Sequence, residues 1–532
     1  MRSLAVLVGA ALALAAQTGN RSARLEWLSD QGFGLFIHWS VDSQLGTVIS
    51  HSMVGASDDY LRRFAGELPK TFNPRKFQPR DWAALAKLAG VRYVVFTAKH
   101  HSGFCMYETA TTDFSITHTP FRRDITGEVL AAFREEGIAP GLYFSPDDFW
   151  WLWRNGKTLQ RNVPDVAPQN NPGLLAHDRA QVKELLSRYG PIDVIFLDGP
   201  PEGLRELAWQ MQPDIVVTRG AIQTPEQYIP GVPLEGTWEA CITMGTAWQY
   251  QPRNEVYKSG GELISLLVET RAKGGNLLLN VGPKPDGELP IEQEERLREM
   301  ALWMFVNGEA IYGVRPWVIT NEGDYWFTKK KNEDTLYVVV KEPRRWQRGE
   351  WKEIVLRSVA ATAATEASVL GQNDRVLEYR PEVVPKTTWK QEPGGLRIRA
   401  MHAQRLQDNS RWPNPVVLKL THVKTALVPP RVATRGARWD TPTGTATLEG
   451  ELLDAGQDAA LEVGFEYRSI RGQDAHERTE PWTPAGFARR ASPGRFTARV
   501  TGWKPGGVYE FRAVVKHPLL TLYGGDQRIT VK

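Results

Sequence analysis

Residues 194–201 read VIFLDGPP: an apolar run from Val194 to Leu197 is followed at once by a carboxylate, Asp198, and then by a glycine and two prolines. A short, unbroken, β-branched-rich run is typical of a strand in a parallel sheet that is covered on both faces. Barrel enzymes carry their chemistry on the loops at the carboxyl ends of such strands. Because a carboxylate is costly to bury without a partner or a function, Asp198 is a candidate catalytic residue.

More apolar runs of this kind alternate with amphipathic stretches from Leu25 to about Ile311. The amphipathic stretches carry apolar residues at helical spacing and end on glycine, a common helix stop. This alternation predicts parallel α/β architecture, and the length favours a closed, TIM-type (β/α)8 barrel. The further runs are GLFIHW, RYVVFTAKHH, APGLYFSPDD, DIVVTRG and NLLLNVGP, and the helical stretches span residues 80–90, 125–137 and 176–190.

With 532 residues the chain is too long for one compact core. Residues 18–312 form the predicted barrel domain. Over residues 313–428, strand-like runs separated by polar turns predict a β-sandwich. Pro429 and Pro430 suggest a linker, and residues 429–532 resemble a fibronectin type III module.

Residues 1–17 have the pattern of a secretory signal peptide: one Arg precedes an apolar run with small residues near its end. The run is too short to span a bilayer comfortably, and no other window is long and apolar enough. We therefore expect a bacterial protein exported to the periplasm or the medium, without a membrane span. Cys105 and Cys241 are the only cysteines, so we expect isolated thiols rather than a disulfide framework.

The composition argues against two classes of binding partner. A formal net charge of +4 is small for this length, so neither nucleic acid nor an acidic membrane surface is expected as a partner. The 19 tryptophans suit the apolar faces of sugars, although strand packing in the β domains accounts for most of them. The sequence does not predict an oligomeric state.

Polar side chains follow nearly every predicted barrel strand, and parallel strands bring such ends to one rim. His100 and His101 suggest a metal at first sight, but neighbours on a strand point to opposite faces and no Asp or Cys completes a ligand set, so no metal is expected. His38 could instead be a core histidine, Arg219 could neutralise a buried carboxylate, and an Asp at a strand end could cap a helix. The rim candidates are His38, Trp39, Lys99, His100, His101, Tyr143, Asp147, Asp148, Asp198 and Arg219.

Six segments in this order resemble glycoside hydrolase family 29, the α-L-fucosidases: GFGLFIHWS, FTAKHHSGF, GLYFSPDD, IDVIFLDG, TWEACITMGTAWQY and GGNLLLNVGPKPDGELP. The resemblance covers residues 25–312, and a β-sandwich usually follows in that family. It implies an exo-acting hydrolase that releases L-fucose from fucosylated oligosaccharides or glycoconjugates by a retaining, two-step mechanism without a cofactor. A pair of carboxyl groups is needed for such chemistry.

The resemblance also implies roles. Asp198 is the expected nucleophile, and Glu239 is preferred over Glu235 as the acid/base. The sugar contacts are expected from His38, Trp39, His100, His101, Tyr143, Arg219 and Trp248.

The chain departs from the family pattern at Ser40, at Phe196 and over residues 51–60, where a Glu-Trp pair is absent. Another L-sugar of similar shape therefore stays open as the substrate. Two further alternatives are an exported glycan-binding protein that has lost catalysis, and an unrelated barrel enzyme that uses the histidine pair with a metal.

Overall fold

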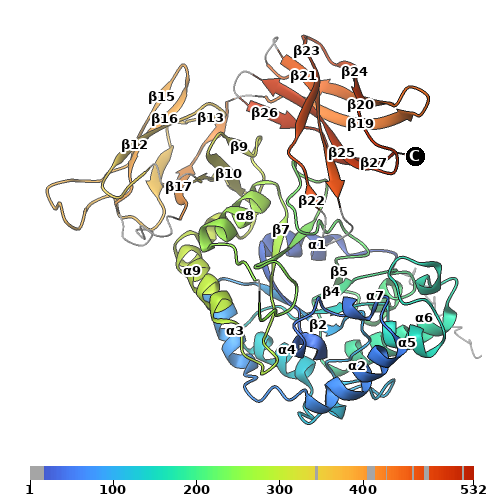
Figure 1. Cartoon of the computed structure of the whole chain (residues 1–532). Helices are drawn as coiled ribbons and strands as arrows, with labels where there is room; N and C mark the ends of the chain where they lie inside the picture. The colour runs from blue at the N-terminus through green and yellow to red at the C-terminus, as the bar shows by residue number, and fades with distance from the viewer. Residues whose placement is uncertain are drawn as a thin grey trace, which may run out of the picture.

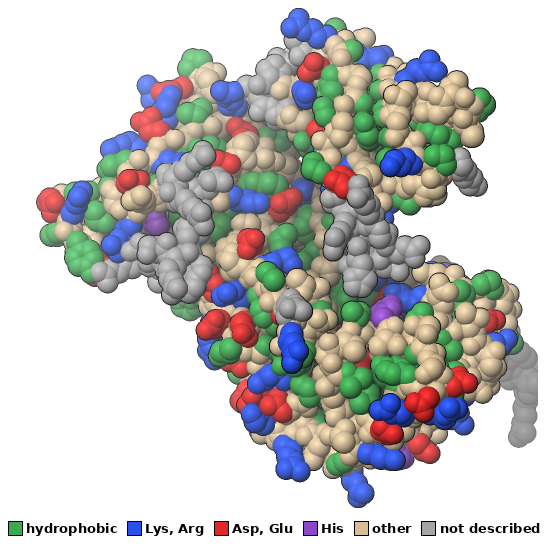
Figure 2. All heavy atoms as spheres, in the orientation of Figure 1, with side chains coloured by type: hydrophobic (Ala, Val, Ile, Leu, Met, Phe, Trp, Pro, Cys, Tyr) green, Lys and Arg blue, Asp and Glu red, His purple; other side chains and the backbone are tan. Residues whose placement is uncertain are grey.

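The computed structural model describes residues 17–253, 255–341, 346–403, 414–426, 428–457, 461–471, 478–517 and 520–531 (Figure 1). Nearly all of the expected signal peptide lies outside these residues. In the part of the chain that is described, no helix is long and apolar enough to cross a membrane. On the face drawn in Figure 2, Lys and Arg side chains are interspersed with Asp and Glu.

The first part of the chain is built on a seven-stranded parallel sheet that curls as a half-barrel, in the order β5-β4-β3-β2-β1-β7-β6. Its strands are buried along their whole length, as their apolar sequences predict. The strands are β1 (Phe33–Ile37), β2 (Tyr93–Lys99), β3 (Gly141–Phe144), β4 (Val194–Leu197), β5 (Val216–Val217), β6 (Glu239–Thr243) and β7 (Asn276–Val281).

The expected closed ring of eight strands is therefore corrected for the described residues. Where an eighth strand would close the ring, residues 223–227 make isolated parallel bridges, from Gln223 to Trp238, just before β6, and from Glu226 to Cys241 within β6. These residues come a few positions after β5 in the chain. The backbone thus runs from one edge of the sheet to the other, and Pro225 and its polar neighbours form no continuous strand there.

Helices cover the sheet (Figure 1). The stretches predicted from glycine-terminated helical spacing are confirmed as α3, α4 and α6, and Gly90, Gly137 and Gly190 behind them all have positive φ. The helices are α1 (Ser22–Gln31), α2 (Asp58–Thr71), α3 (Pro79–Leu88), α4 (Ile125–Glu135), α5 (Phe149–Arg154), α6 (Pro172–Arg188), α7 (Arg205–Met211), α8 (Gly260–Ala272) and α9 (Ile291–Asn307).

Antiparallel sheets follow this first part of the chain and share one apolar core, which includes Phe327, Val338 and Ile398. Their main strands pair in the orders β14-β17-β11-β10-β8 and β12-β16-β15. The strands are β8 (Val314–Arg315), β9 (Asn321–Glu322), β10 (Tyr325–Lys330), β11 (Leu336–Val340), β12 (Trp351–Leu356), β13 (Val359–Ala360), β14 (Glu366–Val369), β15 (Thr388–Glu392), β16 (Gly395–Met401), β17 (Val416–Thr421) and β18 (Lys424–Thr425).

The last strands form a unit that we call the C-terminal module, β19 to β27. Two antiparallel sheets pack on a core that includes Leu448, Phe465 and Phe511. The strands are β19 (Arg431–Asp440), β20 (Thr445–Asp454), β21 (Leu461–Arg471), β22 (Arg478–Thr479), β23 (Thr483–Arg490), β24 (Gly494–Thr501), β25 (Val508–His517), β26 (Leu520–Tyr523) and β27 (Gln527–Thr530).

Candidate active site

A cavity of about 380 Å³ opens where the sheet strands β1 to β4 end. This is the rim at which the strand-end residues were expected to converge, and most of them do. His38, His100, His101, Tyr143, Asp198, Arg219 and Trp248 all line it, together with residues that were not among the predicted site residues: Phe36, Val48, Ile49, His51, Arg161, Phe196, Glu226, Gln227, Cys241, Thr246, Ala247 and Gln251.

Asp198 is the most strongly held group in the cavity. Its Oδ1 accepts hydrogen bonds from Arg161 Nη2 at 2.8 Å and from Arg219 Nη1 at 3.0 Å. Its Oδ2 accepts one from the Tyr143 hydroxyl at 2.7 Å and lies 3.5 Å from His101 Nε2. Burial alone would raise the pKa of Asp198, but the two guanidiniums hold it well below the usual value. Asp198 is therefore an ionised, oriented carboxylate.

Glu226 is the second carboxyl group in the cavity, and sequence reasoning missed it. It lies in TPEQY (224–228), just beyond the Arg219 strand end, and its Oε2 is 2.8 Å from Arg219 Nη1. Because that nitrogen also lies 3.0 Å from Asp198 Oδ1, the two carboxylate oxygens are at most about 6 Å apart. Burial, opposed by Arg219 and reinforced by the Asp198 charge, raises the pKa of Glu226. The pKa values of the two carboxyl groups are thus shifted in opposite directions, down for Asp198 and up for Glu226.

Glu239, the predicted acid/base, is not in the cavity. It begins β6, at the amino end of that strand, and its carboxyl is fully buried and accepts a hydrogen bond from the Tyr93 hydroxyl. Cys241, two residues further along the same strand, is the β6 residue that reaches the cavity. Glu235 is exposed and does not line the cavity either. The placement of both acids at the reaction centre is therefore wrong.

Trp39 is also misplaced by the prediction. It is fully buried, and its ring packs against Phe72, Phe77 and Trp82, with centroids 5.5 to 5.7 Å apart. His38, its neighbour, faces the cavity instead, with Nδ1 2.6 Å from Asn280 Oδ1. Consecutive residues of an extended chain point in opposite directions, so only one of this pair reaches the sugar site.

His100 and His101 both turn into the cavity, contrary to the expectation that they point to opposite faces. They follow β2, where the backbone is no longer a strand, and their ring centroids are 4.2 Å apart. Ser50 and Ser145 hydroxyls contact the Nδ1 atoms of His100 and His101, respectively. Burial lowers the pKa of each ring well below the usual value, so both are neutral near pH 7.

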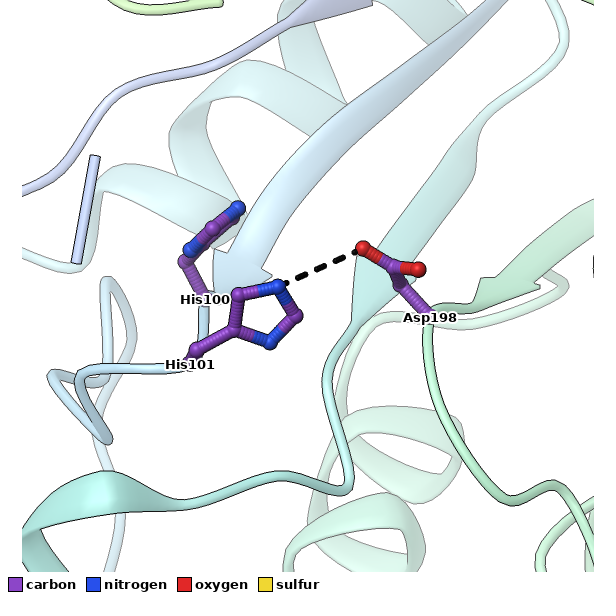
Figure 3. A group of neighbouring side chains, drawn as sticks. All are labelled: His100, His101 and Asp198. Carbon is purple, nitrogen blue, oxygen red and sulfur yellow. Dashed lines mark ion pairs between the residues drawn. The ribbon is translucent and has the colours of Figure 1, made fainter. Parts of the chain in front are cut away.

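The same two histidines and Asp198 place ligand atoms within 4.8 Å of one another, close enough to hold a metal ion (Figure 3). The surroundings oppose that use. Arg161 and Arg219 already contact Asp198, so a cation in this position would face two guanidiniums. The cluster is better suited to hydrogen bonds with hydroxyl groups.

One wall of the cavity is aromatic. The Phe36 ring lies 5.1 Å from Phe196 and 5.9 Å from Trp248, and Trp248 lies 4.8 Å from His38. Apolar rings therefore stand beside the hydroxyl-binding groups, as a deoxy sugar with an exposed methyl group requires.

The remaining strand-end charges lie outside the cavity lining. Lys99 Nζ contacts Asp178 at 2.8 Å and Asp148 at 3.3 Å, and all three side chains are buried. Asp148 also accepts a hydrogen bond from Trp151 N at the start of α5, which confirms the helix-capping interpretation. Asp147 contacts Arg161 Nε at 3.1 Å and so supports the guanidinium that holds Asp198. Cys105 and Cys241 are both free and buried, as expected.

Comparisons with known proteins identify the family of this chain. The α-L-fucosidase family model matches residues 13–309. The chain is 30% identical to the plasma α-L-fucosidase of Rattus norvegicus, over 59% of this chain and 76% of that one, and 31% identical to an α-L-fucosidase of Branchiostoma floridae, over 59% and 78%.

Solved structures give the same result. α-L-Fucosidase isoenzyme 1 from Paenibacillus thiaminolyticus aligns over 75% of this chain and 98% of that chain, with a TM-score of 0.59 and 27% identity. The Thermotoga maritima α-fucosidase in complex with a mechanism-based inhibitor aligns over 74% and 96%, with a TM-score of 0.59 and 28% identity. The chain belongs to the α-L-fucosidase family.

Proposed function

We propose that this glycoside hydrolase is an exo-acting, retaining α-L-fucosidase in which Asp198 is the nucleophile and Glu226 is the acid/base. One observation carries the proposal: Arg219 contacts both carboxylates through one nitrogen, which keeps their oxygens within about 6 Å. Retaining glycosidases place their carboxyl groups roughly 5–5.5 Å apart, whereas inverting enzymes need about 6.5–9.5 Å to admit a water. The short distance between these two oxygens supports the retaining arrangement.

The two carboxyl groups have different roles in each step, one as the nucleophile and one as the acid/base. In the first step, Asp198 attacks the anomeric carbon while Glu226 gives its proton to the departing glycosidic oxygen, which leaves a fucosyl ester on Asp198. In the second step, ionised Glu226 takes a proton from water, the resulting hydroxyl attacks the anomeric carbon, and Asp198 leaves as a carboxylate. Two displacements restore the original anomeric configuration.

Sugar recognition follows from the lining. Neutral His38, His100 and His101 supply ring nitrogens for the hydroxyl groups, and Phe36, Phe196 and Trp248 offer apolar contact for the methyl group. A cavity of about 380 Å³ suits one terminal monosaccharide, which supports exo action on fucosylated glycans. Another L-sugar with the same hydroxyl pattern is the second candidate.

Export to the periplasm or the medium is part of the proposal. The apolar, small-residue-rich amino terminus supports a signal peptide over residues 1–17. A fibronectin type III-like fold for residues 429–532 is supported by two antiparallel sheets on a shared core. Domain boundaries near residues 312 and 428 are supported by the change from parallel to antiparallel pairing and by the proline pair.

The test is fucose release from 2-chloro-4-nitrophenyl α-L-fucoside and from fucosylated trisaccharides, followed by proton NMR of the first sugar anomer formed. We expect α-L-fucose first, with mutarotation to the β anomer later, and no loss of turnover with a chelator. Initial β-L-fucose would refute the double displacement. Turnover of a different α-L-glycoside alone would favour another L-sugar, and glycan binding without turnover would favour a lectin-like protein.

A further inference from the structure

Glu226 stands at the start of an irregular segment, residues 227–237, that contains no helix or strand. On the Glu226 side, the backbone is held by β6 and by Arg219: Gln227 N donates to Cys241 O at 3.0 Å, and Arg219 Nη2 donates to Thr224 O at 3.3 Å. Gln227 has a left-handed φ of 61°. A carboxyl group that must meet a glycosidic oxygen needs a fixed backbone on both flanks, because loops are otherwise the mobile parts of a fold.

The backbone on the other flank, at Pro230 and Gly231, is held by hydrogen bonds to two separate parts of the chain. Lys273 Nζ, behind α8, donates to Pro230 O at 2.6 Å. Gly231 N, the next residue along, donates to Asp526 Oδ2 at 3.2 Å. Asp526 lies between β26 and β27, so this contact comes from the C-terminal module, almost 300 residues further along the chain.

The contact is closely packed. Arg512 of β25 lies beside Asp526, with Nη1 3.8 Å from Oδ1, and its guanidinium is fixed by two hydrogen bonds to Glu466. A Cβ added to Gly231 would come within 2.1 Å of Arg512 Nη1. The backbone at Gly231 therefore approaches the module as closely as only a glycine allows.

A cavity of about 490 Å³ adjoins this contact and contains several aromatic residues. The cavity does not have the form of a second sugar site, because cationic side chains already lie over the rings of Trp482 and Trp326. The guanidiniums of Arg468 and Arg512 lie 4.3 and 3.9 Å from the centre of Trp482, and Lys341 lies 4.3 Å from that of Trp326. The aromatic residues thus help to hold the charges of the interface.

We propose that the C-terminal module positions the acid/base: Asp526 and Arg512 fix Gly231, and the short segment between Gly231 and Glu226 transmits that fixation to the catalytic carboxyl. This inference rests on the proposed role of Glu226. Asp526 and Arg512 are positioning residues, since neither lines the sugar cavity.

The test compares two substrates in the full-length protein. 2,4-Dinitrophenyl α-L-fucoside has a leaving group that departs without a proton, whereas methyl α-L-fucoside needs the acid. Asp526→Ala removes the acceptor for Gly231 N, and Gly231→Ala forces the loop away from Arg512. We expect either change to lower kcat/KM for the methyl fucoside at least tenfold. For the dinitrophenyl fucoside, kcat/KM should fall less than twofold, because misplacement of the Glu226 carboxyl affects only the proton transfer.

Asp454→Ala is the matched control: Asp454 also accepts a hydrogen bond from a glycine N–H, that of Gly456, but within the C-terminal module. It should leave both substrates unchanged, and Asp526→Asn, which keeps the acceptor oxygen, should retain most of the methyl fucoside activity. Equal losses on both substrates, or no loss on either, in Asp526→Ala and Gly231→Ala would overturn the inference. An intact protein that hydrolyses neither fucoside would instead refute the proposed function itself.

Discussion

Arg161→Ala is the most informative change to the nucleophile's surroundings. Arg161 Nη2 contacts Asp198 Oδ1 at 2.8 Å, and its Nε contacts Asp147 at 3.1 Å. Arg219 and Tyr143 remain after the substitution, so Asp198 keeps part of its support. A charge-assisted hydrogen bond contributes about 1.5–3 kcal/mol, which corresponds to a loss of roughly 10- to 150-fold in kcat/KM.

The same change should move the pH profile. Because Arg161 is the foremost group that lowers the pKa of Asp198 against the effect of burial, its removal lets that pKa rise, and the acid limb of kcat/KM should shift to higher pH. The assay is aryl fucoside hydrolysis from pH 3 to 9, with Arg154→Ala, an exposed arginine on α5, as the control. Unchanged kcat/KM and an unchanged acid limb in Arg161→Ala would refute the reasoning.

Three further predictions concern other groups. Burial raises the pKa of Glu239 from 4.5 to about 7, so between these pH values the folded chain keeps a proton that the unfolded chain releases, and the free energy of unfolding falls as pH rises. Glu239→Gln lacks this titration, so in urea titrations the difference in unfolding free energy between variant and parent should shift in favour of the variant from pH 5 to pH 8. Its kcat/KM should stay within about threefold of that of the parent. Trp39→Ala should lower the free energy of unfolding by about 3–5 kcal/mol in the same titrations and leave KM unchanged, since the ring is core rather than sugar platform. Because Glu226 must be protonated, kcat/KM for methyl α-L-fucoside should fall on the basic side, whereas the dinitrophenyl fucoside should lack this limb.

The strand-end pattern predicted much of the cavity lining. An apolar run that ends on an acid placed Asp198 correctly, and the same reasoning brought His38, His100 and Tyr143 to one cavity. The reasoning works because parallel strands have one common carboxyl edge, and the chain must bring every residue at that edge together.

The errors have equally physical causes. The resemblance implied that Glu239 of TWEACITM is the acid/base, but Glu239 opens a strand, so its carboxyl lies at the amino edge beside Tyr93. Glu226 lies where the sheet fails to close, in a stretch with no strand pattern to mark it. Arg161 comes from the irregular connection between α5 and α6, and only the folded chain brings it to Asp198.

The same search for polar residues after a strand, applied to β5, would have pointed to Glu226. Arg219 follows that strand directly, and TPEQY is the next acidic stretch after it. The family resemblance favoured Glu239 instead, although Glu239 precedes the apolar part of β6 rather than following it.

The most direct test of the central claim is the anomeric configuration of the fucosyl azides formed by Asp198→Gly and Glu226→Ala when azide is added to an activated fucoside. Without the nucleophile, azide attacks the substrate from the face that Asp198 occupied, so Asp198→Gly should give β-L-fucosyl azide. Without the acid/base, azide displaces Asp198 from the fucosyl ester, so Glu226→Ala should give α-L-fucosyl azide. Glu239→Ala should form neither azide, and an α-L-fucosyl azide from Glu239→Ala instead of Glu226→Ala would contradict the assignment.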